Sequence, residues 1–227
     1  MNITSFPDTK QGKVLFEKLQ KMYAEPQRFY HNLTHIANLF TLFSQYQTQI
    51  EDKKAIFWTI WFHDCVYQPQ KNDNEEQSAI IAEKELKTIA LDIQELEIQE
   101  TIKHIQITDS HINTEFINKV SNFILATKTH TNPTQNSDLQ WFLDFDLAVL
   151  GSAENIYDEY AANIRKEYAH IPTWKYNFGR RKVLTSFLAK PKIFHYLAPH
   201  YEQQARENLA REIRQLTKYC FIYRFIR

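Results

Sequence analysis

The stretch Lys53–Asp64 reads KKAIFWTIWFHD, and its pattern is the strongest indication of how the chain folds. From Ala55 to Phe62 the residues are apolar with a single exception, so the stretch has no polar face. A helix that is hydrophobic all round packs in the interior of a protein. We therefore expect a buried helix over about residues 53–63, which would give the polar pair His63-Asp64 a rigid mount.

The scarcity of glycine extends the helical prediction to the whole chain. Only 3 of the 227 residues are Gly, whereas β-folds need many tight turns, which usually recruit Gly. Apolar residues recur at helical spacing in residues 8–24, where Val14, Leu15, Leu19 and Met22 form a stripe. The sequence predicts an all-α fold, with further helices at about residues 32–46, 74–89, 93–107, 114–129, 137–151, 153–168, 173–190 and 199–219.

Polar residues that precede three of these stretches predict helix caps, because their side chains accept hydrogen bonds from unpaired N–H groups. The cap residues are Asp73 or Asn74, Asn136 or Ser137, and Ser152. Because no linker or repeat interrupts the chain, we expect a single domain over residues 1–227, with a C-terminal helical extension. Its last residues, Phe221–Arg227, are apolar and basic at once, and would pack on the body of the domain or on a partner.

Composition narrows the class of protein. Hydrophobic residues make up 43% of the chain and aromatic residues 14%, which excludes disorder as the main state. Lys+Arg and Asp+Glu both number 27, so no net charge attracts a nucleic acid polymer or an anionic membrane, and neither is expected as a partner. The start lacks a signal peptide, no apolar run approaches a membrane helix, and the two Cys suggest no disulfide framework. We expect a cytoplasmic protein.

Residues typical of a metal site gather at three places. His31 and His35 are four apart within YHNLTH (residues 30–35), so on a helix they would share one face. His63 and Asp64 follow the buried stretch, and Asp146 lies in FLDFDLA further on. Imidazole and carboxylate suit a divalent transition metal that activates water. Taken alone, the His63-Asp64 pair fits a structural role equally well.

Four motifs together carry a family resemblance. They are YHNLTH at residues 30–35, HDCVY at 63–67, DNEEQSA at 73–79 and DLAVLG at 146–151. In this order they resemble the HD superfamily of metal-dependent phosphohydrolases, and within it a bacterial family that carries all four. The first motif also resembles the opening of the cyclic-nucleotide phosphodiesterase site. The resemblance runs from about Arg28 to the C-terminal helix, which is most of the chain.

The resemblance implies a helical bundle with a divalent ion (Mn, Mg, Zn, Co, Ni or Fe) bound to His35, His63, Asp64 and Asp146. The implied activity is hydrolysis of a small phosphoester, such as a nucleotide or a related metabolite. Many two-metal relatives place a further histidine where this chain has Asn74-Glu75-Glu76, so we expect one tightly held ion.

The resemblance also suggests residues around the ion that take part in catalysis beside Asp64. His31 would protonate the leaving-group oxygen; the alternatives are a fifth ligand or a hydrogen-bonding core histidine. Glu75 and Glu76 would orient a water molecule or His31, unless they form a solvated first helical turn. His130 is open to three readings: a ligand, a substrate contact or a loop histidine.

Substrate phosphate needs cations, and guanidinium groups bind phosphate oxygens in pairs. The candidates are Arg28, Lys128 and Arg165, although the ordinary fate of a helical cation is a surface ion pair. Tyr67 and Tyr30 would line the pocket, and Cys65 would be a small buried residue rather than a nucleophile.

Two other functions compete with hydrolysis. One is a non-catalytic module that binds a metal or nucleotide as a sensor. The other is an HD oxidase with two irons, against which the missing histidine near Asn74 argues. The sequence leaves the oligomeric state open, with a homodimer among the options.

Overall fold

The structure, a computed structural model, describes residues 6–102 and 112–222, and the side chains of residues 6–95 and 112–217. Every regular element in these residues is a helix, which confirms the predicted all-α fold. The chain divides into two compact units, Met1–Leu139 and Gln140–Arg227, and the division falls inside a helix. The single HD-type domain stays a prediction.

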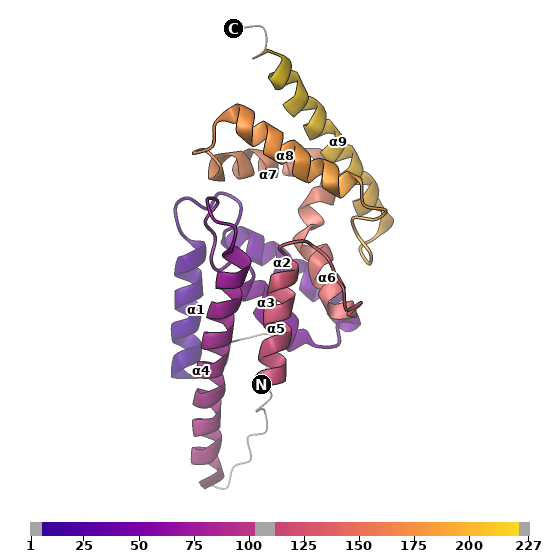
Figure 1. Ribbon diagram of the computed structural model, residues 1–227. Helices are drawn as coiled ribbons and strands as arrows, with labels where there is room; N and C mark the ends of the chain where they lie inside the picture. Colours follow the sequence, from indigo (N-terminus) through magenta and orange to yellow (C-terminus); the bar gives the residue numbers. More distant parts are fainter. Residues whose placement is uncertain (1–5, 103–111, 223–227) are drawn as a thin grey trace. The chain divides into compact units, whose positions relative to one another are not determined.

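The elements follow one another along the chain as labelled in Figure 1, where η denotes a 3-10 helix. The first unit contains α1 Lys10–Tyr23, α2 Leu33–Tyr46, η1 Gln47–Gln49, α3 Lys53–Phe62, α4 Asn74–Ile102 and α5 Thr114–Ala126. The second contains α6 Ser137–Asp146, which starts just before the division, η2 Ala148–Gly151, α7 Glu154–Glu167, α8 Thr173–Leu188 and α9 Pro199–Ile222.

Helix α3 is the core of the first unit. All its residues from Ala55 to Phe62 are buried, as the apolar pattern predicts. The Asp52 carboxylate caps it by accepting a hydrogen bond from the Ala55 N–H at 3.0 Å, and Lys119 of α5 donates to the other oxygen at 2.8 Å. Helices α2, α4 and α5 pack around α3. Because α3 is surrounded, His63 at its C-terminal end is held in the interior.

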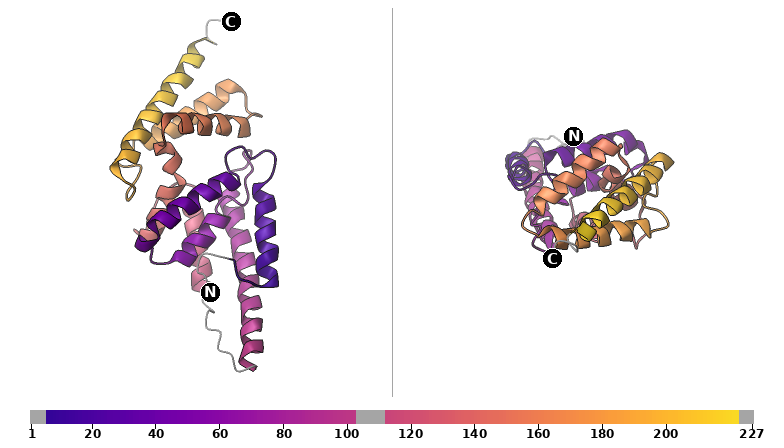
Figure 2. Two further views of the ribbon diagram at one scale, coloured as in Figure 1. Left: turned by 180° about the vertical axis from the view of Figure 1, so that it is seen from behind. Right: turned by 90° about the horizontal axis from the view of Figure 1, so that it is seen from above.

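Helix α4 is a single helix where the sequence pattern predicts two. It runs without interruption from Asn74 to Ile102, through the predicted break between Ile89 and Ile93. No Gly or Pro stands in that interval, so nothing in it ends a helix. Helix α4 lies between α1 and α5, and its C-terminal turns extend past both (Figures 1 and 2). The second of the two predicted helices was expected to reach residue 107. Its residues after Ile102 lie outside the described part of the chain, which resumes at residue 112.

The buried stripe of α1 differs by one position from the predicted one. Leu15 and Leu19 are buried as expected, and Tyr23 continues the stripe one turn further. Val14, which was expected to point inward, is 53% exposed. The buried positions are spaced by three and four residues, and Val14 falls outside that series because neighbouring residues on a helix point in different directions.

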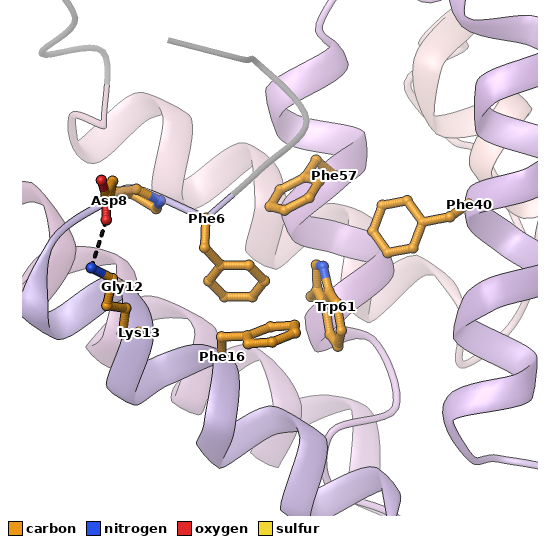
Figure 3. Close-up of a pocket in the computed structure, with 9 residues that line it drawn as sticks. Phe6, Asp8, Gly12, Lys13, Phe16, Phe40, Phe57 and Trp61 are labelled. Carbon is orange, nitrogen blue, oxygen red and sulfur yellow. Dashed lines mark ion pairs between the residues drawn. The ribbon is translucent and has the colours of Figure 1, made fainter.

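An aromatic pocket of about 470 Å³ lies beside α1 and α3 (Figure 3). The Phe6 ring meets the Trp61 ring edge to face, with centroids 5.3 Å apart, and Asp8 pairs with Lys13 at 2.7 Å. The remaining lining residues are Pro7, Gly12, Phe16, Phe40 and Phe57. None of the predicted site residues lines this pocket.

Asparagine caps begin three of the helices. The side chains of Asn32, Asn113 and Asn136 accept hydrogen bonds from the N–H groups of Thr34, Phe116 and Leu139, at 2.8, 2.9 and 2.8 Å. Asn136 confirms one predicted cap. The Ser152 prediction is wrong: its hydroxyl donates to the Val149 carbonyl, and Ala153 holds the cap position of α7 without a side-chain bond.

The second unit contains a buried ion pair between two helices. Arg180 of α8 donates from Nε to Oε1 of Glu212 on α9 at 2.9 Å, and from Nη2 to Oε2 at 3.1 Å. Tyr157 of α7 donates its hydroxyl to the same carboxylate. Burial raises the pKa of Tyr157 far above its usual range, so the hydroxyl keeps the proton that it donates. The pair therefore joins α7, α8 and α9.

Asp144 is buried in the second unit and organises the loop before α9. Its Oδ2 accepts hydrogen bonds from the N–H groups of His195, Tyr196 and Leu197 at 2.8, 2.7 and 3.1 Å. Gln140 donates to the other oxygen at 3.0 Å. One carboxylate thus provides the hydrogen-bond acceptor for three backbone N–H groups of an irregular segment.

Asp144→Ala is expected to lower the free energy of unfolding by about 1–3 kcal/mol, because it removes the acceptor of three backbone N–H groups, of which that of Leu197 is buried. Thermal unfolding followed by circular dichroism measures the change. Asp158→Ala is the matched control: Asp158 lies on α7 of the same unit, and its exposed ion pair with Arg211 contributes little to stability. Equal losses of stability in the two variants would contradict the role given to Asp144.

None of the helices in the described residues combines the length and apolar character that crossing a membrane requires. The side chains of the predicted apolar and basic tail, Phe221–Arg227, lie outside those that the structure describes. The packing expected of this tail therefore stays a prediction.

Candidate metal centre

The structure brings three of the four predicted ligands together in the first unit. His35 lies in α2, His63 is the C-cap of α3, and Asp64 follows it. The His35 and His63 Nε2 atoms are 3.1 Å apart. Asp64 Oδ2 is 3.2 Å from His63 Nε2 and 3.9 Å from His35 Nε2. One potential ligand atom from each residue therefore faces the same small space.

These distances fit a shared cation. Two nitrogen ligands about 2.1 Å from one ion lie about 3.0 Å apart at a right angle and about 3.4 Å apart at a tetrahedral angle. The lone pairs of two facing Nε2 atoms repel each other unless a proton or a cation lies between them, and the nearby Asp64 carboxylate favours the positive charge. The arrangement could hold a divalent ion.

The backbone orients His63 toward this space. Its Nδ1 lies 2.9 Å from the Ile60 carbonyl oxygen, which can only accept a hydrogen bond. Nδ1 therefore carries the proton, and the lone pair of Nε2 points to His35 and Asp64. His35 and His63 are 4% and 1% exposed, so both imidazoles are shielded from bulk water.

His31 lies beside the three ligands but not on the helix that carries His35. Asn32 caps α2, which begins at Leu33, so the predicted shared helical face is wrong. The His31 ring instead stacks on Tyr67, with centroids 4.0 Å apart and planes at 28°. Its Nε2 is 4.0 Å from Asp64 Oδ2, and its side chain is 19% exposed. His31 is thus adjacent to the cluster and more accessible than the two buried histidines.

Arg28 has a different role from the predicted phosphate contact. Its side chain is 1% exposed. Nη1 donates to the carbonyl oxygens of His31 and Asp64, Nη2 to that of Cys65, and Nε to the Glu25 carboxylate. Since the guanidinium is buried and directed at backbone oxygens, it does not present a fork to substrate.

Cys65 is a buried thiol beside the ligands. Burial raises its pKa to about 12, so the group stays protonated and makes a poor nucleophile. This agrees with its interpretation as a small buried residue.

Lys128, which follows α5, forms an ion pair with Glu76 in the first turn of α4. Lys128 Nζ donates to the Glu76 carboxylate and, at 2.7 Å, to the Asn72 carbonyl oxygen. Through this bond Lys128 lowers the pKa of Glu76, and Glu76 raises the pKa of Lys128. The pair ties the residues after α5 to the start of α4, and the contact of Lys128 with substrate phosphate stays a prediction. Glu75 lies in the same first turn.

The other predicted site residues are not members of the three-residue cluster. His130 follows α5 with a left-handed backbone (φ 48°). Arg165 donates to the carbonyl oxygens of Tyr168 and Ile171, at 2.7 and 3.2 Å, at the end of α7, and its contact with substrate phosphate stays a prediction. Asp146 ends α6 in the second unit, and its ligation of the ion stays a prediction.

Two residues of the third motif hold the chain that follows Asp64, a role that the sequence analysis missed. Asn74 accepts a hydrogen bond from the Gln68 N–H and donates one to the Gln68 carbonyl, both at 3.0 Å. The buried Ser78 hydroxyl accepts from the Val66 N–H at 3.1 Å. Asn74 and Ser78 lie one turn apart at the start of α4. This spacing of two polar residues was the feature of the sequence that could have predicted their contacts with the preceding loop.

Comparison of the chain with protein-family models, with curated proteins and with solved structures finds no match. The fold and the cluster define an all-α protein with a candidate centre of two histidines and one aspartate. The resemblance to the HD superfamily is carried by the four sequence motifs and stays a prediction.

Proposed function

We propose that this chain is a metal-dependent phosphohydrolase of the HD type that acts on a small phosphoester, such as a nucleotide. The observation that carries the proposal is the convergence of His35, His63 and Asp64, which follow one another in the order of the HD motifs. Two nitrogens and one carboxylate also form the protein ligands of several hydrolytic zinc enzymes.

In the proposed mechanism His35, His63 and Asp64 hold the ion, with Asp146 as the predicted fourth ligand. When bound, a divalent ion polarises the phosphoryl group and lowers the pKa of water. His31 would donate the proton from Nε2 to the leaving-group oxygen as the bond from phosphorus to that oxygen breaks. The water oxygen bonds to phosphorus and gives up a proton to solvent, and His31 takes a proton back from solvent before the next turnover.

The surroundings of His31 support this assignment. The stacked Tyr67 ring and the edge of Tyr30, whose centroid is 5.0 Å away, restrict the imidazole, so its Nε2 stays near Asp64. Because Arg28, Lys128 and Arg165 donate to other groups of the protein, we assign phosphate binding to the ion and His31.

The test is phosphate release from a panel of nucleotides and other phosphoesters, with Mn, Mg, Zn, Co, Ni or Fe added singly to metal-free protein. At least one ion is expected to support turnover that a chelator abolishes and that the same ion restores. Binding of an ion without phosphate release from any substrate would instead favour the sensor.

A second candidate follows from the same donor set. Two histidines and one carboxylate with open positions are also typical of non-haem iron oxygenases. Bound iron that absorbs visible light, together with oxygen consumption and no phosphate release, would favour an oxidase over the hydrolase.

A further inference from the structure

Arg28 joins two segments of chain that both contribute to the candidate centre. Its Nη1 donates to the His31 carbonyl oxygen at 3.1 Å and to the Asp64 carbonyl oxygen, 36 residues away in the sequence, at 2.7 Å. Its Nη2 donates to the Cys65 carbonyl oxygen at 2.9 Å. One guanidinium therefore holds the backbone of His31 and the backbone on which Asp64 is mounted.

Arg28 is itself held firmly. Nε donates to Glu25 Oε2 at 2.9 Å, and the guanidinium carbon lies 5.2 Å from the Tyr23 ring centroid and 5.8 Å from that of Tyr67. Tyr67 in turn stacks on His31. These contacts leave the planar group one orientation, so it can act as a fixed template for the carbonyl groups that it binds.

The chain after Asp64 is anchored from a second direction. Ser78 and Asn74 of α4 hold Val66 and Gln68, whereas Arg28 holds Asp64 and Cys65. The α4 contacts do not involve the His31 segment. Arg28 therefore relates the backbone position of Asp64 to that of His31, and the Tyr67 ring stacked on His31 adds a side-chain contact between the same two segments.

We propose that Arg28 is a positioning residue: by binding the carbonyl oxygens of His31, Asp64 and Cys65 it sets the geometry of the metal ligands and of His31. This inference rests on the proposed metal centre. A lysine at position 28 would keep the positive charge but lose the planar fork that reaches several carbonyl groups at once.

Titration with Co²⁺, followed by its visible absorption, measures the geometry and the affinity of the centre without any substrate. Arg28→Lys is expected to weaken Co²⁺ binding by about 10- to 100-fold, the usual effect of removing a group that orients metal ligands, and to change the shape of the absorption band. Arg180→Lys is the matched control, because it removes a largely buried, ion-paired guanidinium from the second unit. It should lower stability and leave Co²⁺ affinity unchanged.

The reactivity of Cys65 gives a readout that needs no metal. In a Cys220→Ser background Cys65 is the remaining thiol, and it is fully buried. Arg28→Lys is expected to speed its modification by N-ethylmaleimide at least tenfold in metal-free folded protein, whereas Arg180→Lys should not. If Arg28→Lys does not fold, Glu25→Gln, which replaces the charged acceptor of Arg28 Nε and of Gln27 by a neutral amide, should produce a smaller change in the same direction.

Protection of Cys65 in Arg28→Lys equal to that of the parent protein would overturn the proposal, as would unchanged Co²⁺ affinity. Failure of the parent protein to bind Co²⁺ would count against the proposed function, whereas the Cys65 measurement would still decide the role of Arg28.

Discussion

His63→Ala is expected to weaken the binding of a divalent ion by more than about a hundredfold, beyond the usual loss from changing a group that only orients a ligand. The imidazole supplies the nitrogen nearest to both other ligand atoms, 3.1 Å from His35 Nε2 and 3.2 Å from Asp64 Oδ2. Without the His63 imidazole, the three-residue cluster is reduced to two ligand atoms, His35 Nε2 and Asp64 Oδ2, which lie 3.9 Å apart. Asp64→Ala should have a similar effect, because it removes the negative charge.

Elemental analysis after gel filtration, together with titration of metal-free protein, measures this loss. Far-ultraviolet circular dichroism should show that the helices remain. His195→Ala provides the control: that side chain is exposed, and the residue serves Asp144 through its backbone N–H. Unchanged metal content in both His63→Ala and Asp64→Ala would refute the assignment of the centre.

His31→Asn is expected to leave the metal bound and to lower turnover by about a hundredfold or more, the usual range for loss of a general acid. The reason is its position: Nε2 is 4.0 Å from Asp64 Oδ2, beside the ligands, and the ring is held by Tyr67. The loss should shrink for 4-nitrophenyl phosphate, because a stable leaving oxyanion needs no proton.

The measurement compares turnover and metal content for an alkyl and an aryl phosphate, with His195→Asn as the control. A ligand role predicts the opposite result, in which His31→Asn releases metal and the penalty is the same for both leaving groups. Release of the metal would end the general-acid proposal.

Part of the site was predictable because its signals are local. His63-Asp64 follows a stretch with no polar face, so a buried helix had to place this pair in the interior. His31 shows the limit of the same reasoning. The spacing of His31 from His35 suggested that the two share one helical face. Asparagine, however, is favoured at the N-cap position, so Asn32 caps α2 and the helix begins at Leu33, after His31.

Arg28 and the two aspartates of α6 show what local signals do not contain. The same guanidinium group can bind a phosphate or backbone carbonyl oxygens, so the residue type does not show which of the two Arg28 binds. The burial of its side chain in the folded protein shows that it binds the carbonyl oxygens. Asp144 and Asp146 are two residues apart in one motif. Only packing turns the Asp144 carboxylate into the acceptor for the loop at His195 and leaves Asp146 half-exposed.

The sequence by itself determined the all-α fold and the burial of α3, because helical periodicity is a property of short stretches, whereas the meeting of His35 with His63 and Asp64 was implied only by the family resemblance. The tertiary structure alone decided that His31 stacks on Tyr67 and that Arg28 binds the backbone of His31 and Asp64. Hydrogen bonds between residues 36 apart depend on how the chain packs, and a sequence pattern does not specify which polar groups packing will bring within 3 Å of one another.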